Sequence, residues 1–139
     1  MRSSPLKRTT PLKRKPIKKK VSAKTLCNKA DELAAKACKA CNECQAKGWS
    51  GGGKVIQCSG RLEWAHLKSR SHKTIRHDPL NSMCLCWSHH NFFTCHPDLW
   101  TKFCEEVRPG VWDRLNALLQ EGLKPDYSYW IDYYKRVSS

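Results

Sequence analysis

Residues 61–95 read RLEWAHLKSRSHKTIRHDPLNSMCLCWSHHNFFTC, and this stretch decides the fold that we expect. Its alternating start is typical of a β-strand that ends at His66. A polar, basic loop leads to Asn81, and the next five residues are expected to form a second short strand. A helix should follow, and its start holds the motif CWSHH, residues 86–90. The stretch therefore predicts two strands and a helix that gather a histidine, an asparagine and a Cys/His pair.

The flanking segments show helical more than strand periodicity. Apolar residues recur at three- and four-residue spacing over residues 24–40, which predicts a helix there. Residues 55–66 alternate loosely and indicate a hairpin or a bent strand. Further helices are expected over residues 97–107 and 111–120, and Asp126 is a candidate cap for a last one. We therefore expect an α+β fold that is mostly α, with a small two-stranded element in its middle.

The positive charge is concentrated at one end of the chain. The 139 residues carry a formal net charge of +14, and residues 1–24 hold ten Lys or Arg side chains and no acid. Such a segment has too little apolar area to bury, so residues 1–23 are predicted to be a disordered basic arm and residues 24–139 the folded domain. The arm suits phosphate binding, and a solubilising or targeting tail is the alternative. The partner that we expect is DNA.

The cysteine content indicates metal binding. The sequence has no stretch that approaches a membrane span, and its basic start is not followed by the apolar region of a signal peptide. We therefore expect a cytoplasmic protein without a membrane partner. Nine cysteines in such a compartment favour metal ligation by thiolates over a disulfide framework.

A structural zinc site is the metal site that the spacings predict. Cys86-x-x-His89 has the spacing of half of such a site. The favoured completion is the knuckle Cys41-x-x-Cys44, while Cys58 could replace one of those two cysteines. Cys38-x-x-Cys41 is a second register for the same half. Zn²⁺ bound in this way would clamp the N-terminal helix onto the rest of the fold.

Three residues are candidates for catalysis. Neutral His66 would act as the general base on a water molecule, since imidazole titrates at about pH 6.5. His90 would hold a divalent ion at a scissile phosphate, and Asn81 would bridge the loop and orient His66. Each has a structural alternative: His66 as a core or surface histidine, Asn81 as a turn residue, and His90 as a second zinc ligand or a surface residue. Basic side chains of the loop would position the phosphate backbone: Lys68, Arg70, Lys73 and Arg76.

These motifs closely resemble the HNH (ββα-metal) endonuclease family. In that family an Asn is followed five residues later by Cys-x-x-Cys/His and then by the metal-binding His, as Asn81, Cys86, His89 and His90 are here. The stretches WAHLKSR (64–70) and IRHDPLN (75–81) look most like phage and prophage members. Among these, the NinG (Rap) recombination-protein family shares a basic N-terminus, a helix rich in Lys, Ala and Asp, and a cysteine knuckle. The resemblance is specific over roughly residues 41–100.

The resemblance implies a ββα-metal core with a zinc knuckle and flanking helices. It also implies an enzyme that hydrolyses DNA phosphodiester bonds with Mg²⁺ or another divalent ion. His66 would be the general base, Asn81 its orienting residue and His90 the ligand of the catalytic metal. Since NinG-like members are associated with branched recombination intermediates, branched DNA in a bacterial or phage-infected cell is the expected substrate.

The chain departs from the family pattern at one position of the site. Many HNH enzymes carry an Asp or His metal ligand just before the general base, where this chain has Ala65. The catalytic metal would then be held by His90, water and phosphate oxygens, unless Glu63 or a residue beyond His90 contributes. The alternative function is a zinc-stabilised nucleic-acid-binding protein without catalysis, in which the basic arm would carry the affinity.

Overall fold

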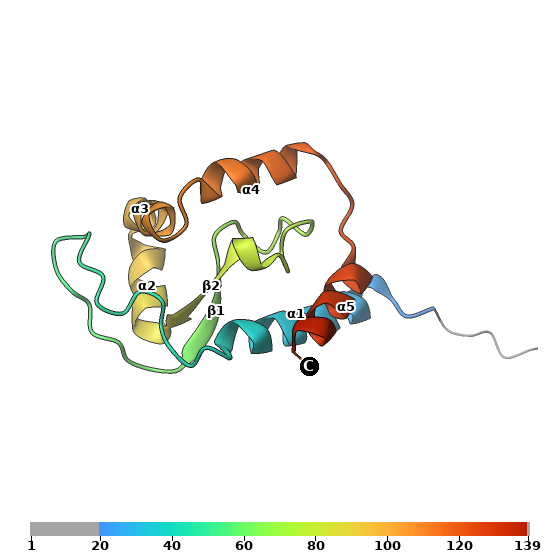
Figure 1. The fold of residues 1–139 in the computed structure, drawn as a ribbon, viewed down its shortest axis with the longest axis horizontal. Helices are drawn as coiled ribbons and strands as arrows, with labels where there is room; N and C mark the ends of the chain where they lie inside the picture. Colours follow the sequence, from blue (N-terminus) through green and yellow to red (C-terminus); the bar gives the residue numbers. More distant parts are fainter. Residues whose placement is uncertain (1–19, 139) are drawn as a thin grey trace, which may run out of the picture.

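The computed structural model describes residues 20–138, and within them the chain is α+β and mostly helical (Figure 1). Five α-helices and a short 3-10 helix surround one antiparallel pair of strands in this part of the chain. The expected fold class is confirmed at this level. Most of the predicted basic arm, residues 1–23, lies outside the described residues. None of the helices in residues 20–138 combines the length and the apolar character that crossing a bilayer requires.

The centre of the fold is a pair of short strands, β1 (Leu62–His66) and β2 (Ser82–Cys86). They pair antiparallel over their whole length, with His66 opposite Ser82. A long loop and a 3-10 helix, η1 (Pro79–Asn81), connect them. Every residue of β2 is buried, because helices cover the hairpin on both faces. His66 therefore stands at the end of the hairpin where the long connection begins.

The segment before β1 differs from the expectation. Residues 55–61 were candidates for a hairpin or a bent strand, but they are irregular. Their backbone instead joins the start of helix α2 (Trp87–Cys95), where the Trp87 N–H donates to the Arg61 carbonyl at 3.0 Å. Gly60 permits this approach, since its φ is +78° and a Cβ there would lie 2.6 Å from the Trp87 side chain. The strand ladder therefore begins only at Leu62.

Helices α3 (Pro97–Val107) and α4 (Val111–Gln120) cover one face of the hairpin together with α2 (Figure 1). Pro97 occupies the first turn of α3, where its missing N–H costs no hydrogen bond. The helices and β2 share one apolar core, whose buried side chains are Met83, Leu85, Phe93, Phe103, Val111 and Leu115. This core fixes the orientation of α2 against the hairpin.

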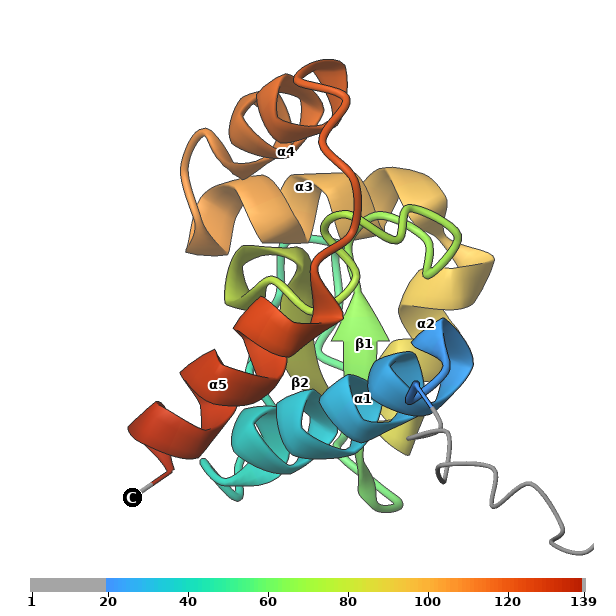
Figure 2. The same cartoon turned by 90° about the vertical axis from the view of Figure 1, so that its right-hand side faces the viewer.

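Helices α1 (Ala23–Lys39) and α5 (Tyr127–Val137) lie side by side on the other face (Figure 2). Asp126 caps α5, as expected, by accepting from a backbone N–H of the first turn. A second apolar cluster forms where Trp64 of β1 packs with Tyr134 of α5 and with α1. Alternate residues of β1 thus face different helical layers, as the period of a strand requires.

Candidate metal centre and candidate active site

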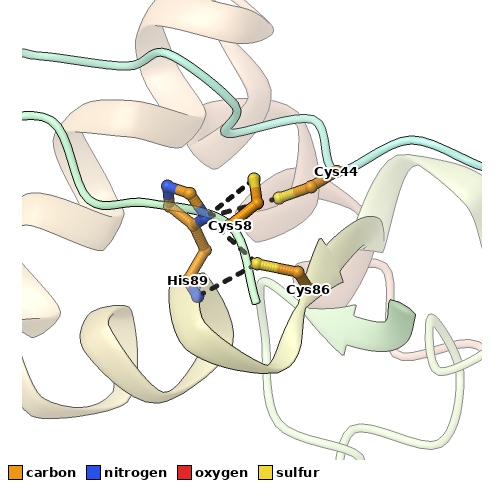
Figure 3. Close-up of side chains that lie close together, drawn as sticks. All are labelled: Cys44, Cys58, Cys86 and His89. Atoms are coloured by element: carbon orange, nitrogen blue, oxygen red, sulfur yellow. Dashed lines mark hydrogen bonds between the residues drawn. The ribbon is translucent and has the colours of Figure 1, made fainter. Parts of the chain in front are cut away.

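Three cysteines and one histidine from separate segments meet beside the start of α2 (Figure 3). Cys44 follows α1, Cys58 precedes the Gly60 turn, Cys86 ends β2, and His89 lies in the first turn of α2. Their three sulfur atoms and one ring nitrogen all lie within 4.8 Å of one another. Cys86 also caps α2, since its Sγ accepts from the His89 N–H at 3.4 Å. The fold therefore brings together four ligand atoms of the types that zinc prefers.

The spacing of these atoms fits a tetrahedral metal site. Zinc holds sulfur at about 2.3 Å and imidazole nitrogen at about 2.0–2.1 Å, so nitrogen and sulfur ligands are separated by roughly 3.5 Å. His89 Nδ1 lies 3.2 Å from Cys86 Sγ and 3.6 Å from the Sγ atoms of Cys44 and Cys58. His89, Cys86 and Cys44 are buried, while Cys58 closes the cluster from the exposed side. The cluster could hold a metal such as zinc.

The thiols of the cluster differ in how readily they ionise. Burial raises the pKa of Cys86, but hydrogen bonds from the backbone and ring of His89 outweigh it and lower that pKa to about 6. Desolvation and the neighbouring Cys44 and Cys86 raise the pKa of Cys58 to about 11. The pKa of Cys44 is also raised, chiefly by burial. One thiolate therefore forms easily and the next ones are opposed, which is the condition that a bound cation relieves.

Cys41, a member of the favoured zinc set, lies outside the cluster. It is exposed, and its Sγ donates to the carbonyl oxygens of Cys38 at 3.4 Å and Glu43 at 3.3 Å. Its side chain lines a cavity between α1 and α5 instead. Cys58, the alternative, takes the fourth place. The sequence signal for this choice is Ser59-Gly60, because the left-handed Gly60 turn carries Cys58 to the start of α2.

His66 is held in a defined orientation at the end of β1. A carbonyl can only accept, so the 3.0 Å contact between His66 Nε2 and the Arg76 carbonyl places the ring proton on Nε2 and leaves the lone pair on Nδ1. The ring packs edge-on against Trp64, with 4.2 Å between ring centroids. Burial lowers the pKa of His66 to about 4, and the charges of Arg70 and Arg76 act in the same direction. The imidazole is therefore neutral at physiological pH.

His90 directly follows the cluster histidine but points elsewhere. Its Nδ1 lies 2.9 Å from Oε1 of Glu63 on β1. A small cavity of about 70 Å³ has both His66 and His90 in its wall, together with Leu85, Phe93, Thr94 and Trp100. The two candidate catalytic histidines are thus brought to one space. Glu63, rather than a residue beyond His90, is the carboxylate that reaches His90.

Asn81 acts on the loop and not on the ring of His66. It is fully buried at the end of η1. Its Oδ1 accepts from the Lys68 N–H at 2.7 Å, and its Nδ2 donates to the Lys68 carbonyl at 3.1 Å. The side chain therefore replaces a backbone partner for the residue two positions after His66. The printed ring partner of His66 is the Arg76 carbonyl.

The basic side chains of the loop have different environments. Arg70 stacks over Trp64 at 5.4 Å and Lys68 over Trp112 at 5.7 Å, and Lys73 is exposed. Arg76 instead forms an ion pair with Asp31 at 2.5 Å, and its side chain is only 19% exposed. Its charge is compensated inside the fold, so Arg76 does not fit the predicted role in phosphate binding. This role requires an exposed, uncompensated cation.

Two further basic residues lie close to His90. A cavity of about 300 Å³ borders Glu63 and His90, and Lys39, Arg61 and Arg70 contribute to its wall. Lys39 ends α1 and Arg61 precedes β1. Both escaped the sequence analysis because neither is near the motif in a recognisable spacing. The tertiary fold alone sets them beside the histidine.

Comparison of the chain with known proteins adds no relative to this geometry. No family model, curated protein or solved structure gives a significant match. A function for the protein therefore rests on two groups of residues. One is the Cys44, Cys58, Cys86 and His89 cluster, and the other is the pair of histidines at the small cavity, with Glu63 and the basic residues beside them.

Proposed function

We propose that this protein is a metal-dependent DNA endonuclease of the HNH type, with the hairpin and α2 as its ββα-metal core. The observation that carries the proposal is the cavity that His66 and His90 share. Each ring is oriented by a hydrogen bond to one of its nitrogens, to a carbonyl for His66 and to a carboxylate for His90. Two imidazoles fixed in this way can serve one phosphodiester group, one as a base and one as a metal ligand.

His66 is the proposed general base. Its Nδ1 takes a proton from a water molecule, and the hydroxide attacks the phosphorus atom of the bound phosphodiester. The bond from phosphorus to the 3′ oxygen breaks, and that oxygen leaves with the electron pair and is then protonated by solvent. The lowered pKa of His66 keeps Nδ1 unprotonated at neutral pH. Asn81 supports this role indirectly, since it holds the backbone at Lys68.

His90 is the proposed ligand of the catalytic ion. Its Nδ1–H donates to Glu63, which leaves Nε2 with the lone pair that coordination needs. A carboxylate partner of this kind fixes the tautomer and makes the imidazole a stronger ligand. When bound, Mg²⁺ or a similar ion stabilises charge on the phosphate and on the leaving 3′ oxygen. Ala65 is buried and offers no ligand atom, so Glu63 is the carboxylate available to the site.

The Cys44, Cys58, Cys86 and His89 cluster is the proposed site of a structural Zn²⁺. Four protein ligands fill a tetrahedral site and leave no position for substrate, which is the arrangement of structural rather than catalytic zinc. The ion would join the segment after α1, the Gly60 turn and the start of α2. Because His89 and His90 are neighbours, zinc binding would also fix the position of the catalytic ligand.

DNA is the proposed substrate, and branched DNA is the form that the NinG-like resemblance suggests. The basic wall of the cavity beside His90, formed by Lys39, Arg61 and Arg70, suits the phosphate that precedes or follows the scissile one. The net charge of +14 supports a polyanionic partner. The proposed setting is the cytoplasm of a bacterial or phage-infected cell.

A non-catalytic nucleic-acid-binding protein is the second candidate. The observation in its favour is Ala65, since the position before the proposed base lacks a metal ligand and is 1% exposed. In this case the zinc cluster would be purely structural, and the basic residues would bind DNA without cleaving it. The two candidates differ in one measurable property, the hydrolysis of the phosphodiester bond.

The test is a nicking assay on supercoiled plasmid DNA with Mg²⁺. We expect the wild-type protein to nick the plasmid and His66→Ala to lower the rate by about 10²–10⁴-fold, the usual contribution of a general base. His90→Ala should abolish the dependence on Mg²⁺ together with the activity, and Glu63→Gln should weaken the apparent affinity for Mg²⁺ by about 10–100-fold.

The matched control is His72→Ala, since His72 is an exposed histidine of the same loop. It should nick at the wild-type rate, and all four variants should keep the zinc content and the DNA affinity of the wild type. Nicking by His66→Ala at the wild-type rate would end the enzyme proposal. A wild-type protein that binds DNA and never nicks it would leave the binding protein as the function.

A further inference from the structure

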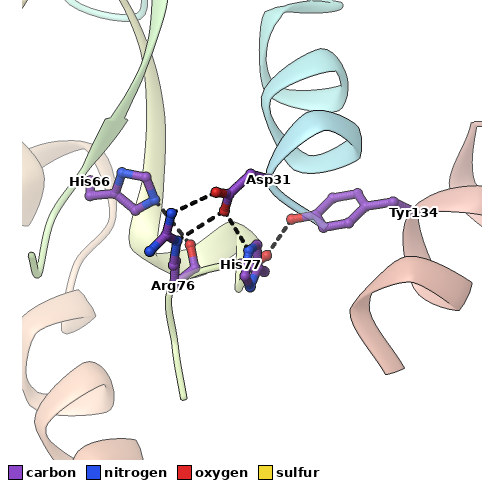
Figure 4. Close-up of polar contacts among 5 residues, drawn as sticks. All are labelled: Asp31, His66, Arg76, His77 and Tyr134. Atoms are coloured by element: carbon purple, nitrogen blue, oxygen red, sulfur yellow. Dashed lines mark hydrogen bonds and ion pairs between the residues drawn. The ribbon is translucent and has the colours of Figure 1, made fainter. Parts of the chain in front are cut away.

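The carbonyl that orients His66 belongs to a residue whose side chain is tied to α1 (Figure 4). Arg76 grips Asp31 with two parallel hydrogen bonds, Nε to Oδ1 at 2.9 Å and Nη2 to Oδ2 at 2.5 Å. A forked pair of this kind fixes direction as well as distance, because both nitrogens of the planar guanidinium are engaged. The position of the Arg76 carbonyl therefore depends on a carboxylate that lies far away in the sequence.

The next residue is held by the same carboxylate and by the last helix. His77 Nε2 lies 2.6 Å from Asp31 Oδ1, and the ring is buried. The His77 carbonyl accepts a hydrogen bond from the Tyr134 hydroxyl on α5 (Figure 4). Residues 76–77 are thus fixed from α1 on one side and from α5 on the other. The rest of the loop between β1 and η1 is irregular.

Asp31 is suited to hold this position at physiological pH. Burial raises the pKa of its carboxyl, but the hydrogen bonds from Arg76 and His77 outweigh burial and lower it. The side chains of Asp31 and Arg76 are 22% and 19% exposed, so the pair is largely withdrawn from solvent. Charge-assisted hydrogen bonds in such surroundings are stronger than neutral ones. The carboxylate is therefore an anchor and not a loosely paired surface group.

We propose that Asp31 is a positioning residue for His66, acting through the side chain and the carbonyl of Arg76. The inference rests on the proposed function, in which His66 is the general base. Without Asp31 the Arg76 carbonyl would be free to move with the loop, and the His66 ring would lose the partner that selects its Nε2–H tautomer. A displacement of about 1 Å at a catalytic group can cost about 100-fold in rate. The outer helix α1 would then be part of the machinery and not only a cover.

The same carboxylate also belongs to a group with metal-ligand chemistry. Cys27, Asp31 and His77 have ligand atoms within 4.8 Å of one another. The guanidinium of Arg76 already supplies the positive charge that a metal would bring, and both Asp31 oxygens are engaged by it. We therefore assign the group to an ion-pair network, and the protein should bind one zinc per chain, at the cysteine cluster.

The test compares Asp31→Asn with Glu32→Gln, which makes the same change of charge at an exposed neighbour on α1. Nicking of supercoiled plasmid with Mg²⁺ should show kcat lowered about 10–100-fold in Asp31→Asn, with KM close to that of the wild type. Nitrogen-15 spectra of the histidine rings, with His66 identified by its loss in His66→Ala, should show the Nε2–H tautomer in the wild type and in Glu32→Gln. Asp31→Asn should show a mixture of tautomers.

The two readouts separate the inference from the proposed function. A wild-type protein that does not nick DNA removes the function, and the ring spectra still test the positioning. Should Asp31→Asn fail to fold, Arg76→Lys keeps the charge and removes the fork, and its His66 spectrum and kcat decide in the same way. A folded Asp31→Asn protein with the wild-type spectrum and kcat would overturn the proposal. A second zinc per chain, lost in Asp31→Asn, would overturn it as well.

Discussion

His89 and His90 are neighbours in one turn of α2, yet the fold gives them opposite environments. His89 is 1% exposed and faces three sulfur atoms. The side chain of His90 is 39% exposed and faces the carboxylate of Glu63. Soft thiolates favour zinc, whereas carboxylate and water favour Mg²⁺ and similar ions. The difference teaches that one helical turn can serve a closed structural site and an open reactive site at once.

The geometry of the helix explains how the two sites stay apart. Successive residues of an α-helix are rotated by about 100°, from 3.6 residues per turn, so two adjacent histidines cannot face the same cluster. Cys86 sets the rotation, since it caps the helix and belongs to the metal cluster at the same time. Displacing this cap would turn both histidines together. The proposed zinc site therefore controls the proposed catalytic one.

The largest effect is expected from breaking the cysteine cluster. Cys44→Ala or Cys86→Ala removes one ligand of the proposed zinc, and zinc binding contributes about as much as the 5–15 kcal/mol that stabilise a domain of this size. Both variants should therefore lose zinc and unfold, as should the wild type after treatment with a strong chelator. Metal analysis and thermal unfolding followed by circular dichroism measure the two losses.

Cys41→Ala is the matched control, because Cys41 lies in the same knuckle but outside the cluster. It should keep one zinc and the wild-type melting temperature, while Cys58→Ala should lose both. The reverse result, with Cys41 essential and Cys58 dispensable, would contradict the geometry of the cluster.

A smaller effect is expected from the protonation of His66. Burial lowers its pKa to about 4 in the folded protein, while an unfolded chain titrates at about 6.5. The unfolded state then binds more protons between these values, so the free energy of unfolding falls as the pH is lowered through this window. Denaturant titrations should show a weaker fall in His66→Gln, which keeps the zinc cluster and lacks the imidazole. Equal pH dependence in the two proteins would contradict the burial of a neutral ring.

The smallest effect on either site is expected from removing residues 1–19. These residues lie outside the described part of the chain and carry most of the basic side chains of the predicted arm. The shortened protein should bind DNA about tenfold more weakly near 0.15 M salt, with a flatter dependence of affinity on salt. Its zinc content and its nicking rate at saturating DNA should match the wild type. Fluorescence anisotropy with labelled DNA at several salt concentrations gives the slope.

The local elements of the core could be predicted because their signals are local. Alternation before His66, the cap at Asp126 and the proline at the start of α3 depend on neighbours in the sequence. The strand proposed for residues 55–61 failed for a non-local reason. Its backbone finds hydrogen-bond partners at the start of α2, across the turn that Gly60 permits, instead of a strand beside it.

By itself the sequence determined the α+β class, the hairpin followed by a helix, and the gathering of His66, Asn81 and the 86–90 motif. These follow from periodicity, capping and the fixed reach of short segments. Only the tertiary structure decided that Cys58 and not Cys41 joins the cluster, that Arg76 serves Asp31 and not a phosphate, and that Glu63 meets His90. Those choices depend on which distant side chains the packing of whole helices brings into contact, and no spacing along the chain records that.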